Sequence, residues 1–331
     1  MSRPFALSPQ RPRGYPWQND PSSLSSSNAK PGSGTVSGIA LGVWHCGTFR
    51  LPYRKQPLVM GILNVTPDSF SDGGRFFSPR RAVAQALRMQ EAGADLIDVG
   101  GESTRPGALP VPQEEEMRRV LPVIEKLAGR LTVPISIDTT RSAVARRALE
   151  AGAAIINDIS GGVRDPDMFR VAAAPKAGLI LMHRRGTPQT MQRAPRYRNL
   201  IAEVRQFLAR QAQAALDAGV ARSRIAIDPG IGFGKTVRHN LTLIAQIDAL
   251  TRLGLPILVG PSRKSFIGKV LARGAATLDA SERLFGTAAA LAICILHGAR
   301  IVRVHDVAAA LQVVRVADAI RAECLEPPSC P

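Results

Sequence analysis

Polar side chains end eight short apolar runs that recur along the sequence. The runs, in order, read LVMGILN, ADLIDVG, VPISIDT, AIINDIS, GLILMH, RIAIDPG, PILVGPS and RIVRVHD. The polar residues at or just after their ends are Asn64, Asp98, Asp138, Asn157 with Asp158, His183, Asp228, Ser262 with Arg263 and Lys264, and Arg303 with His305. Asp and Asn at such places often form turns or helix caps, so each position alone is ambiguous. Eight together favour a functional rim, where carboxylates accept hydrogen bonds and basic groups bind an anion.

The glycine-rich segment from Gly230 to Thr236 is similar to two phosphate-binding motifs but satisfies neither. Pro229 stands where a Walker A loop needs its first glycine, and Lys235 stands where a dinucleotide-binding fingerprint needs its third. The glycines that remain still allow the backbone to approach a flat ligand closely. The chain also contains no recognisable Ser-His-Asp set or other activated nucleophile, so covalent catalysis is not expected.

The apolar runs alternate with longer amphipathic segments from Pro57 onward. Helical patterns such as RRAVAQALRMQEAG, EEEMRRVLPVIEKLA and RSAVARRALEAG lie between them, and ERLFGTAAALAICILHG precedes the last run. Eight strand–helix units of this kind predict an α/β fold, the TIM (β/α)8 barrel, whose C-terminal strand ends share one face and carry the active site. A doubly wound open sheet is the alternative, because periodicity alone does not show closure.

Two segments precede the barrel pattern. Two β-like runs, 39–44 and 48–53, are joined by His45, Cys46 and Gly47 and predict an N-terminal β-hairpin that plugs the bottom of the barrel. Residues 1–37 are rich in Pro, Ser, Gly and Arg and lack a hydrophobic period, so we expect a disordered extension. Its composition faintly resembles an organellar transit peptide and lacks an apolar secretion signal. The predicted organisation is an extension, 1–37, followed by one barrel domain, 38–325.

The composition argues against several classes of function. The 331-residue chain has a net charge of +17, but its arginines are scattered and aromatic residues make up only 5%, so no nucleic-acid partner is expected. A distributed positive charge suits small anionic substrates instead. No apolar run reaches the ~18–20 residues that span a bilayer, so no membrane association is expected. The four cysteines form no CxxC pair, which favours reduced thiols and a cytoplasmic location.

Eight motifs occur along the chain in a fixed order. They read GILNVTPDSFSDGG, DVGGESTRPG, ISIDTT, INDIS, LMHRRGTPQTMQ, DPGIGFGK, GPSRKSFIG and RVHDV, and the region they mark covers residues 43–322. In sequence and spacing they resemble the signatures of dihydropteroate synthases, a family of pterin-binding enzymes. The resemblance implies a (β/α)8 barrel that condenses (7,8-dihydropterin-6-yl)methyl diphosphate with p-aminobenzoate. The products would be 7,8-dihydropteroate and diphosphate, in folate biosynthesis, and sulfonamides would compete with p-aminobenzoate.

The resemblance also implies roles for residues at the strand ends. The residues expected to bind the pterin are Asp138, Asn157, Met182, Asp228, Phe233 and Lys264. Those expected to bind the diphosphate are Asn64, Arg105, Arg303 and His305, with Asn64 helping to hold Mg²⁺. Those expected to place p-aminobenzoate are Thr104, Pro106, Phe233 and Ser262, the last at the predicted start of a helix. The residues expected to act in catalysis are Asp138, Arg105, Lys264 and His305.

The chemistry of these groups predicts a dissociative reaction. The bond from the pterin methylene to oxygen should break early, because the ring delocalises the resulting cation, and Asp138 should stabilise that cation electrostatically. Mg²⁺, Arg105, Arg303 and His305 should stabilise the departing diphosphate. The arylamine of p-aminobenzoate is already unprotonated near neutral pH, so its attack needs no strong base.

Several other polar residues have a structural interpretation. Asp98 is expected mainly to anchor the second loop, because an Asp at a strand end commonly caps a turn. His183 ends one of the apolar runs and is a rim candidate, but it also begins a less constrained loop, so a surface position is the alternative. His239 and His297 are expected to be ordinary helix residues rather than ligands.

Three other functions stay open on the sequence. A methyltetrahydrofolate-to-corrinoid methyltransferase would share the pterin-binding strand ends but would not need the STRPG, SRKS and RVHD motifs. A non-catalytic homologue would not need the catalytic set to be intact. A nucleic-acid binder rests on the net charge alone. The apolar last helices, predicted over 284–296 and 307–320, leave room for a homodimer interface.

Overall fold

Eight parallel strands form one sheet that curls into a barrel. The strands are β3 (Leu58–Asn64), β4 (Leu96–Gly100), β5 (Ile135–Asp138), β6 (Ile155–Asp158), β7 (Gly178–Met182), β8 (Ile225–Asp228), β9 (Leu258–Val259) and β10 (Ile301–Val304). Their order in the sheet is β8-β7-β6-β5-β4-β3-β10-β9. The two ends of this order meet, since Ile227 of β8 pairs in parallel with Ile257, the residue before β9. The predicted (β/α)8 barrel is confirmed, and the open-sheet alternative is wrong.

The computed structural model describes residues 42–66, 78–105, 107–274 and 276–324, all within a compact unit that spans Ala40–Pro331. The predicted extension, residues 1–37, and the candidate residue Pro106 lie outside the described residues. The predicted domain limits at residues 38 and 325 do so as well.

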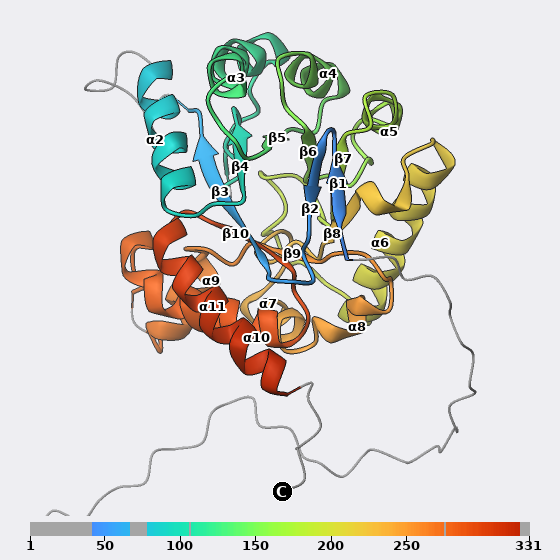
Figure 1. Cartoon of the computed structure of the whole chain (residues 1–331). Helices are drawn as coiled ribbons and strands as arrows, with labels where there is room; N and C mark the ends of the chain where they lie inside the picture. Colours follow the sequence, from blue (N-terminus) through green and yellow to red (C-terminus); the bar gives the residue numbers. More distant parts are fainter. Residues whose placement is uncertain (1–41, 67–77, 106, 275, 325–331) are drawn as a thin grey trace, which may run out of the picture. The chain divides into compact units, whose positions relative to one another are not determined.

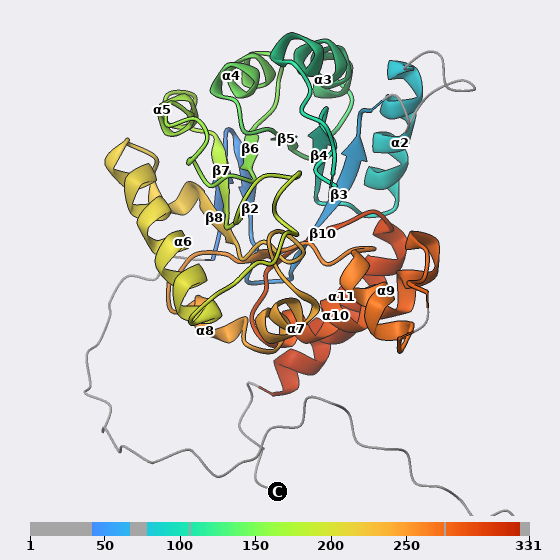
Figure 2. The same cartoon turned by 180° about the vertical axis from the view of Figure 1, so that it is seen from behind.

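Helices follow the strands and surround the barrel (Figure 1, and from behind in Figure 2). They are α2 (Pro79–Glu91), α3 (Gln113–Ala128), α4 (Ser142–Glu150), α5 (Met168–Ala173), α6 (Leu200–Asp217), α7 (Val237–Ala245), α8 (Asp248–Thr251), α9 (Ser265–Leu271), α10 (Leu284–Leu296) and α11 (Val307–Glu323). Two short 3-10 helices, η1 (Arg222–Arg224) and η2 (Ala280–Arg283), precede β8 and α10. None of the helices in the described ranges has the length and apolar character needed to cross a membrane.

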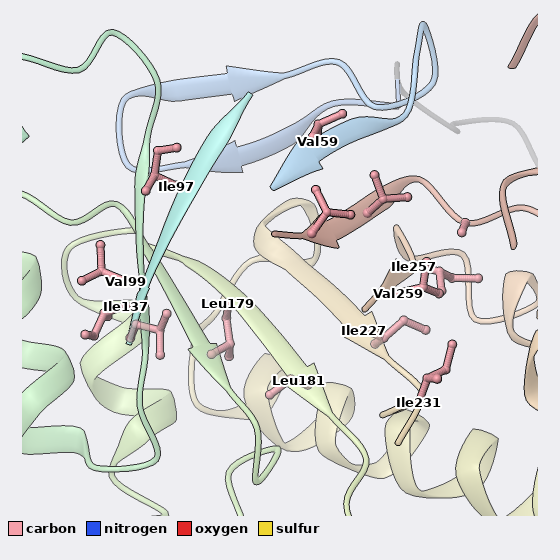
Figure 3. Packing of buried hydrophobic residues seen from close by; sticks show 14 of the residues in the cluster. Val59, Ile97, Val99, Ile137, Leu179, Leu181, Ile227, Ile231, Ile257 and Val259 are labelled. Carbon is pink, nitrogen blue, oxygen red and sulfur yellow. The ribbon is translucent and has the colours of Figure 1, made fainter. Parts of the chain in front are cut away.

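Alternate residues of the strands pack into two separate hydrophobic cores. Val99 and Ile137, which are paired in register on β4 and β5, belong to the layer between the sheet and the helices (Figure 3). Met60 and Leu96 belong to a second core inside the barrel. A parallel sheet that is covered on both faces needs apolar residues at nearly every strand position. This requirement explains why the strands appear in the sequence as continuous apolar runs.

A β-hairpin closes the N-terminal end of the barrel. It consists of β1 (Trp44–Cys46) and β2 (Phe49–Leu51), which pair antiparallel. Trp44 packs in the inner core with the first residues of several strands, and its Nε1 donates to a backbone oxygen of η1 at 2.8 Å. The predicted hairpin is confirmed, but its turn comes later than expected. His45 lies inside β1, and the chain reverses at Gly47, whose φ of +58° suits glycine.

Candidate active site

The C-terminal ends of the strands bring the predicted polar residues to one rim of the barrel. Asn64, Asp138 and Asp228 are the last residues of β3, β5 and β8, and Asn157 is the penultimate residue of β6. Parallel strands in a closed barrel end on the same face, so positions far apart in the chain become neighbours. Asp138, Asn157 and Asp228 are buried. Buried polar groups need partners, and the partners of these three identify the site.

Arg303 of β10 joins two buried carboxylates. Its Nε donates to Asp98 Oδ2 at 2.6 Å, and its Nη2 donates to Asp138 Oδ2 at 2.7 Å. Asn157 Nδ2 also donates to Asp98 Oδ2, at 3.0 Å. Asp98 is 0% exposed and contacts two predicted site residues, so the interpretation of Asp98 as mainly a loop anchor is too narrow. Strand alternation could have placed it, because Asp98 shares the inward face of β4 with Leu96.

Burial and neighbouring charges control the protonation of this network. Burial raises the pKa of Asp138 to about 7, the Arg303 guanidinium opposes the shift, and the carboxylates of Asp98, Glu116 and Asp158 add to it. A carboxyl group with this pKa is only partly ionised near neutral pH. It would respond strongly to a positive charge that develops beside it.

Lys264 and Phe233 contact each other at the part of the rim formed by β8 and β9. Lys264 Nζ lies 3.7 Å from the centroid of the Phe233 ring, a cation–π contact, and donates to Ile231 O at 2.5 Å. Burial lowers the pKa of Lys264 to about 7, and the Asp228 carboxylate opposes that shift. Asp228 Oδ1 itself accepts a hydrogen bond from Gly230 N at 2.6 Å. The Asp228 carboxylate, an acceptor, and the Lys264 ammonium, a donor, therefore attract each other beside the face of the Phe233 ring.

A small apolar cluster adjoins these polar groups. Met182 and Phe233 pack with Ile159 and Met191, separately from the two main cores. All four side chains come from the C-terminal ends of strands or from the loops that follow them. Apolar surface of this kind suits the faces of a flat ring, while the neighbouring carboxylates suit its edge.

Ser262 and His305 form a second contact between the last two strand ends. Ser262 Oγ lies 3.0 Å from His305 Nδ1 and accepts from His305 N at 3.2 Å. Burial lowers the pKa of His305 to about 4, and the positive charge of Arg303 adds to this effect. The imidazole is therefore neutral at pH 7. The charge of Arg105 acts on the pKa of His305 in the same direction.

The predicted position of Ser262 at a helix start is wrong. Helix α9 begins three residues later, at Ser265, because Arg263 has a φ of +57° and turns the chain before the helix. Arg263 is held in this conformation from two sides. Its Nε donates to Asp306 Oδ2 at 2.8 Å, and its backbone N donates to Thr287 Oγ1 at 3.1 Å. Ser262 accordingly contributes its hydroxyl to the rim rather than a helix N-terminus.

The loop after β4 carries Thr104, which is half-buried, and Arg105, which is exposed. One guanidinium holds the base of this loop. Arg141 Nη1 donates to Glu102 Oε2 at 2.8 Å and forms an ion pair with Glu116, which is 1% exposed. Its Nη2 donates to a backbone oxygen at the far end of the loop, at 2.5 Å. The strand end that carries Asp138 is thereby tied to the loop that carries two other candidate residues.

The metal-binding capacity of the rim is small. In the described ranges no three His, Cys, Asp or Glu side chains come together to hold a metal ion. Asn64, at the end of β3, offers one amide oxygen. This sparse donor set fits Mg²⁺, which prefers oxygen and is often held by one or two protein groups together with waters and substrate phosphates.

The sequence interpretation left His183 between a rim position and a surface position, and it assigned Lys235 no role. His183 is buried (6% exposed), so the surface alternative is wrong. Lys235, which appeared in the sequence only as a mismatch to a glycine motif, is 2% exposed, and its Nζ lies 3.1 Å from His183 Nδ1. A signal for His183 was its place directly after the fully buried strand β7. His239 has the structural role expected of it, since it completes the capping box of α7 with Thr236.

The sequence matches the family described as "Pterin binding enzyme" over residues 60–305. It is also 54% identical to the dihydropteroate synthase of a Synechocystis strain over 268 residues, which cover 81% of this chain and 91% of that protein.

Solved structures agree with this match. The dihydropteroate synthase of Xanthomonas albilineans with 4-aminobenzoic acid is 44% identical, with a TM-score of 0.78, and the match covers 85% of this chain and 98% of that one. The dihydropteroate synthase of Burkholderia cenocepacia complexed with 7,8-dihydropteroate is 46% identical, with a TM-score of 0.75. The match covers 85% of this chain and 97% of that one. The chain is thus similar to proteins whose structures hold 4-aminobenzoic acid or 7,8-dihydropteroate.

Proposed function

Because the chain belongs to the dihydropteroate synthases, a family of pterin-binding enzymes, we propose that it condenses (7,8-dihydropterin-6-yl)methyl diphosphate with p-aminobenzoate. The products are 7,8-dihydropteroate and diphosphate. One observation carries the proposal: the carboxylates of Asp98 and Asp138 share the Arg303 guanidinium at a rim that also holds Asp228 and Lys264. Such a rim offers acceptors and donors to a heterocycle beside cationic groups for an anion.

The edge of the pterin ring is recognised by the buried carboxylate of Asp228 and the buried amide of Asn157. Asp228 and Asn157 supply oxygens and an amide from β8 and β6, which lie on either side of β7. Lys264 donates to the oxo side of the ring. Met182 and Phe233 cover the ring faces. The apolar cluster that contains these last two side chains supports this assignment.

The diphosphate binds to the cationic part of the rim. The bonds to Asp98 and Asp138 use two of the five N–H donors of Arg303, and the guanidinium can present others to phosphate oxygens. The neutral His305 ring adds a hydrogen bond rather than a charge, since it can donate through Nε2 when Nδ1 accepts from Ser262. Arg105 approaches from the loop after β4.

Asn64 would hold Mg²⁺ through its amide oxygen, together with oxygens of the substrate. The bound ion would neutralise charge on the leaving group.

Loss of diphosphate comes before attack by the amine. The pterin ring delocalises the cation that is left on the methylene group, and the Asp138 carboxylate stabilises it at close range. The arylamine is neutral at pH 7 and carries its own lone pair, so no residue has to remove a proton before it attacks. Only the ionised form of Asp138 provides this stabilisation, and its attraction for the substrate grows as the cation develops.

The arylamine lies between the loop after β4 and the start of α9. Thr104, Pro106 and Phe233 contact its ring, and Ser262 lies at its far side. Sulfonamides, which share its arylamine ring and negative end, should compete with it at this position.

A second copy of the chain is the partner that best fits the exposed apolar face of α10 and α11, helices that pack against each other. Its exposed large apolar residues are Leu284, Phe285, Ile293, Leu296, Val316 and Ile320. A monomer rarely exposes such a group of side chains, and a two-fold axis would cover it with an equivalent surface. A homodimer is therefore part of the proposal.

The function is tested with the purified full chain, Mg²⁺ and both substrates. Diphosphate should be released only when p-aminobenzoate is present, in equal amount to the dihydropteroate formed, and a sulfonamide should raise the apparent KM for p-aminobenzoate without changing kcat. Absence of dihydropteroate at saturating substrates would refute the proposal.

A further inference from the structure

Lys235 is a buried cation at the end of the glycine-rich segment between β8 and α7. Its Nζ lies 2.9 Å from Phe233 O, 3.1 Å from His183 Nδ1 and 3.4 Å from His183 O. An ammonium group has three N–H donors, so these three acceptors use all of them. Lys235 is only 2% exposed. It therefore has neither a free donor nor the exposure to contact a substrate.

The His183 ring is a fixed acceptor for this lysine. Burial lowers the pKa of His183 to about 3, and the positive charge of Lys235 adds to the effect. The ring is neutral, and Nδ1 accepts from the ammonium, so its proton is on Nε2. The ring also packs edge-on against Phe207, with the centroids 5.0 Å apart. Its orientation is thus set by packing as well as by the hydrogen bond.

The same contacts lead to Asp228. His183 N donates to Asp228 O at 2.9 Å, and Asp228 Oδ1 accepts from Gly230 N at 2.6 Å. Gly230 has a φ of +69° and lies directly on the His183 carbonyl, where a Cβ would come within 1.9 Å of the oxygen. Lys235 therefore contacts the backbone of Phe233 directly. It also contacts His183 at the end of β7, which is linked through its own backbone and through Gly230 to Asp228.

A second lysine holds the same segment from another position. Lys264 Nζ donates to Ile231 O, while Lys235 Nζ donates to Phe233 O, two residues further along. Two buried ammonium groups thus bind alternate carbonyl groups of one short loop. The loop carries the aromatic ring of Phe233, and its backbone holds Asp228.

Burial of the Lys235 ammonium has an energetic cost that packing alone does not explain. Burial lowers the pKa of Lys235 to about 7, and the Asp228 carboxylate opposes that shift. A methionine could fill a similar volume without desolvating a charge, and apolar replacements of buried ions are often neutral or stabilising. The charge of Lys235 is therefore better explained by a role in orienting neighbouring groups than by a contribution to the stability of the fold.

Resting on the proposed function, we propose that Lys235 is a positioning residue for the pterin. Its ammonium holds the Gly230–Phe233 segment and the Asp228 carboxylate in the geometry that accepts the edge and face of the ring. It does so through Phe233 O and the His183 ring, without touching the substrate.

The test measures two binary affinities, neither of which requires turnover. The ligands are 6-hydroxymethylpterin, the ring system in oxidised form without its leaving group, and inorganic diphosphate, which binds the other part of the rim. Lys235→Met should weaken pterin binding at least ten-fold and change diphosphate binding less than two-fold. Lys126→Met, which removes an exposed lysine of α3, should change neither.

A second pair of variants keeps the test decisive if Lys235→Met fails to fold. His183→Leu removes the side-chain acceptor and should weaken pterin binding three-fold or more, whereas His183→Asn retains an oxygen near the Nδ1 position and should recover most of the loss. Pterin binding that stays within two-fold of the parent in Lys235→Met, or equal loss of both ligands, would overturn the inference. So would His183→Leu and His183→Asn variants that bind the pterin equally. Failure of the parent protein to bind the pterin at all would instead refute the proposed function.

Discussion

Asp98 and Asp138, on the neighbouring strands β4 and β5, accept hydrogen bonds from the same guanidinium, that of Arg303, at 2.6 and 2.7 Å. Two carboxylates with one cation leave a net negative charge when both are ionised. Asp98 Oδ2 also accepts a hydrogen bond from Asn157 Nδ2, so the charge of Asp98 is compensated by two donors. Asp138 is thus the carboxylate whose charge can turn toward a positive centre on the substrate.

Asp138→Asn should separate this electrostatic role from simple binding. The amide keeps the shape and one acceptor, but it lacks the charge that stabilises a developing cation. We expect kcat to fall on the order of 100-fold, the usual size of such an effect. The Kd of 6-hydroxymethylpterin, measured by fluorescence titration, should change less than about five-fold. Equal losses in kcat and pterin affinity would show that Asp138 is only a ligand of the ring.

The pH dependence of kcat/KM should be bell-shaped and centred near neutrality. This parameter reports the free protein, in which burial raises the pKa of Asp138 to about 7 and lowers that of Lys264 to about 7. Activity should fall below pH 7 as Asp138 gains a proton and above it as Lys264 loses one. Asp98→Asn removes a charge that raises the pKa of Asp138, so it should move the acid limb to lower pH. An acid limb that stays in place would rule out Asp138 as the group responsible.

The strand order and the rim could be predicted because both depend on local patterns. A parallel strand that is buried on both sides needs continuous apolar residues, and the polar residue at its C-terminal end marks the rim of the barrel. Asn64, Asp138 and Asp228 were found in this way. The hairpin turn was predicted too early. The chain reverses at Gly47, after Cys46 ends the strand, because Gly47 adopts a positive φ, and the apolar pattern carries no information on backbone torsion.

The contacts between residues of the rim could not be predicted, because they depend on which side chains lie close together across the barrel. Nothing near Asp98 in the sequence indicates Arg303, which is 205 residues away. Lys235 and His183 are 52 residues apart, and nothing in the sequence pairs them. Buried charges of this kind are recognised only once the fold shows which of them lack access to water.

Arg141→Met should destabilise the fold as well as the loop after β4. It leaves Glu116 as a buried carboxylate without its cation, and loss of one partner from such a pair typically costs about 3 kcal/mol in the free energy of unfolding. Urea denaturation followed by circular dichroism measures the change. Arg147→Met is the matched control, because its ion pair with Glu150 is exposed (60% and 55%) and should contribute less than about 1 kcal/mol. Similar midpoints for the two variants would contradict the role given to Arg141.

Phe285→Asp should separate the proposed homodimer into monomers. Phe285 is 87% exposed on α10 and belongs to the apolar face that this helix forms with α11. A carboxylate there would be desolvated at the centre of a two-fold contact, next to the equivalent charge of the partner, and both effects oppose association. Sedimentation velocity should show one species of twice the chain mass for the parent and of single mass for the variant. Val163→Asp, at an exposed valine after β6, is the control and should remain dimeric. A parent that sediments as a monomer would refute the proposed homodimer.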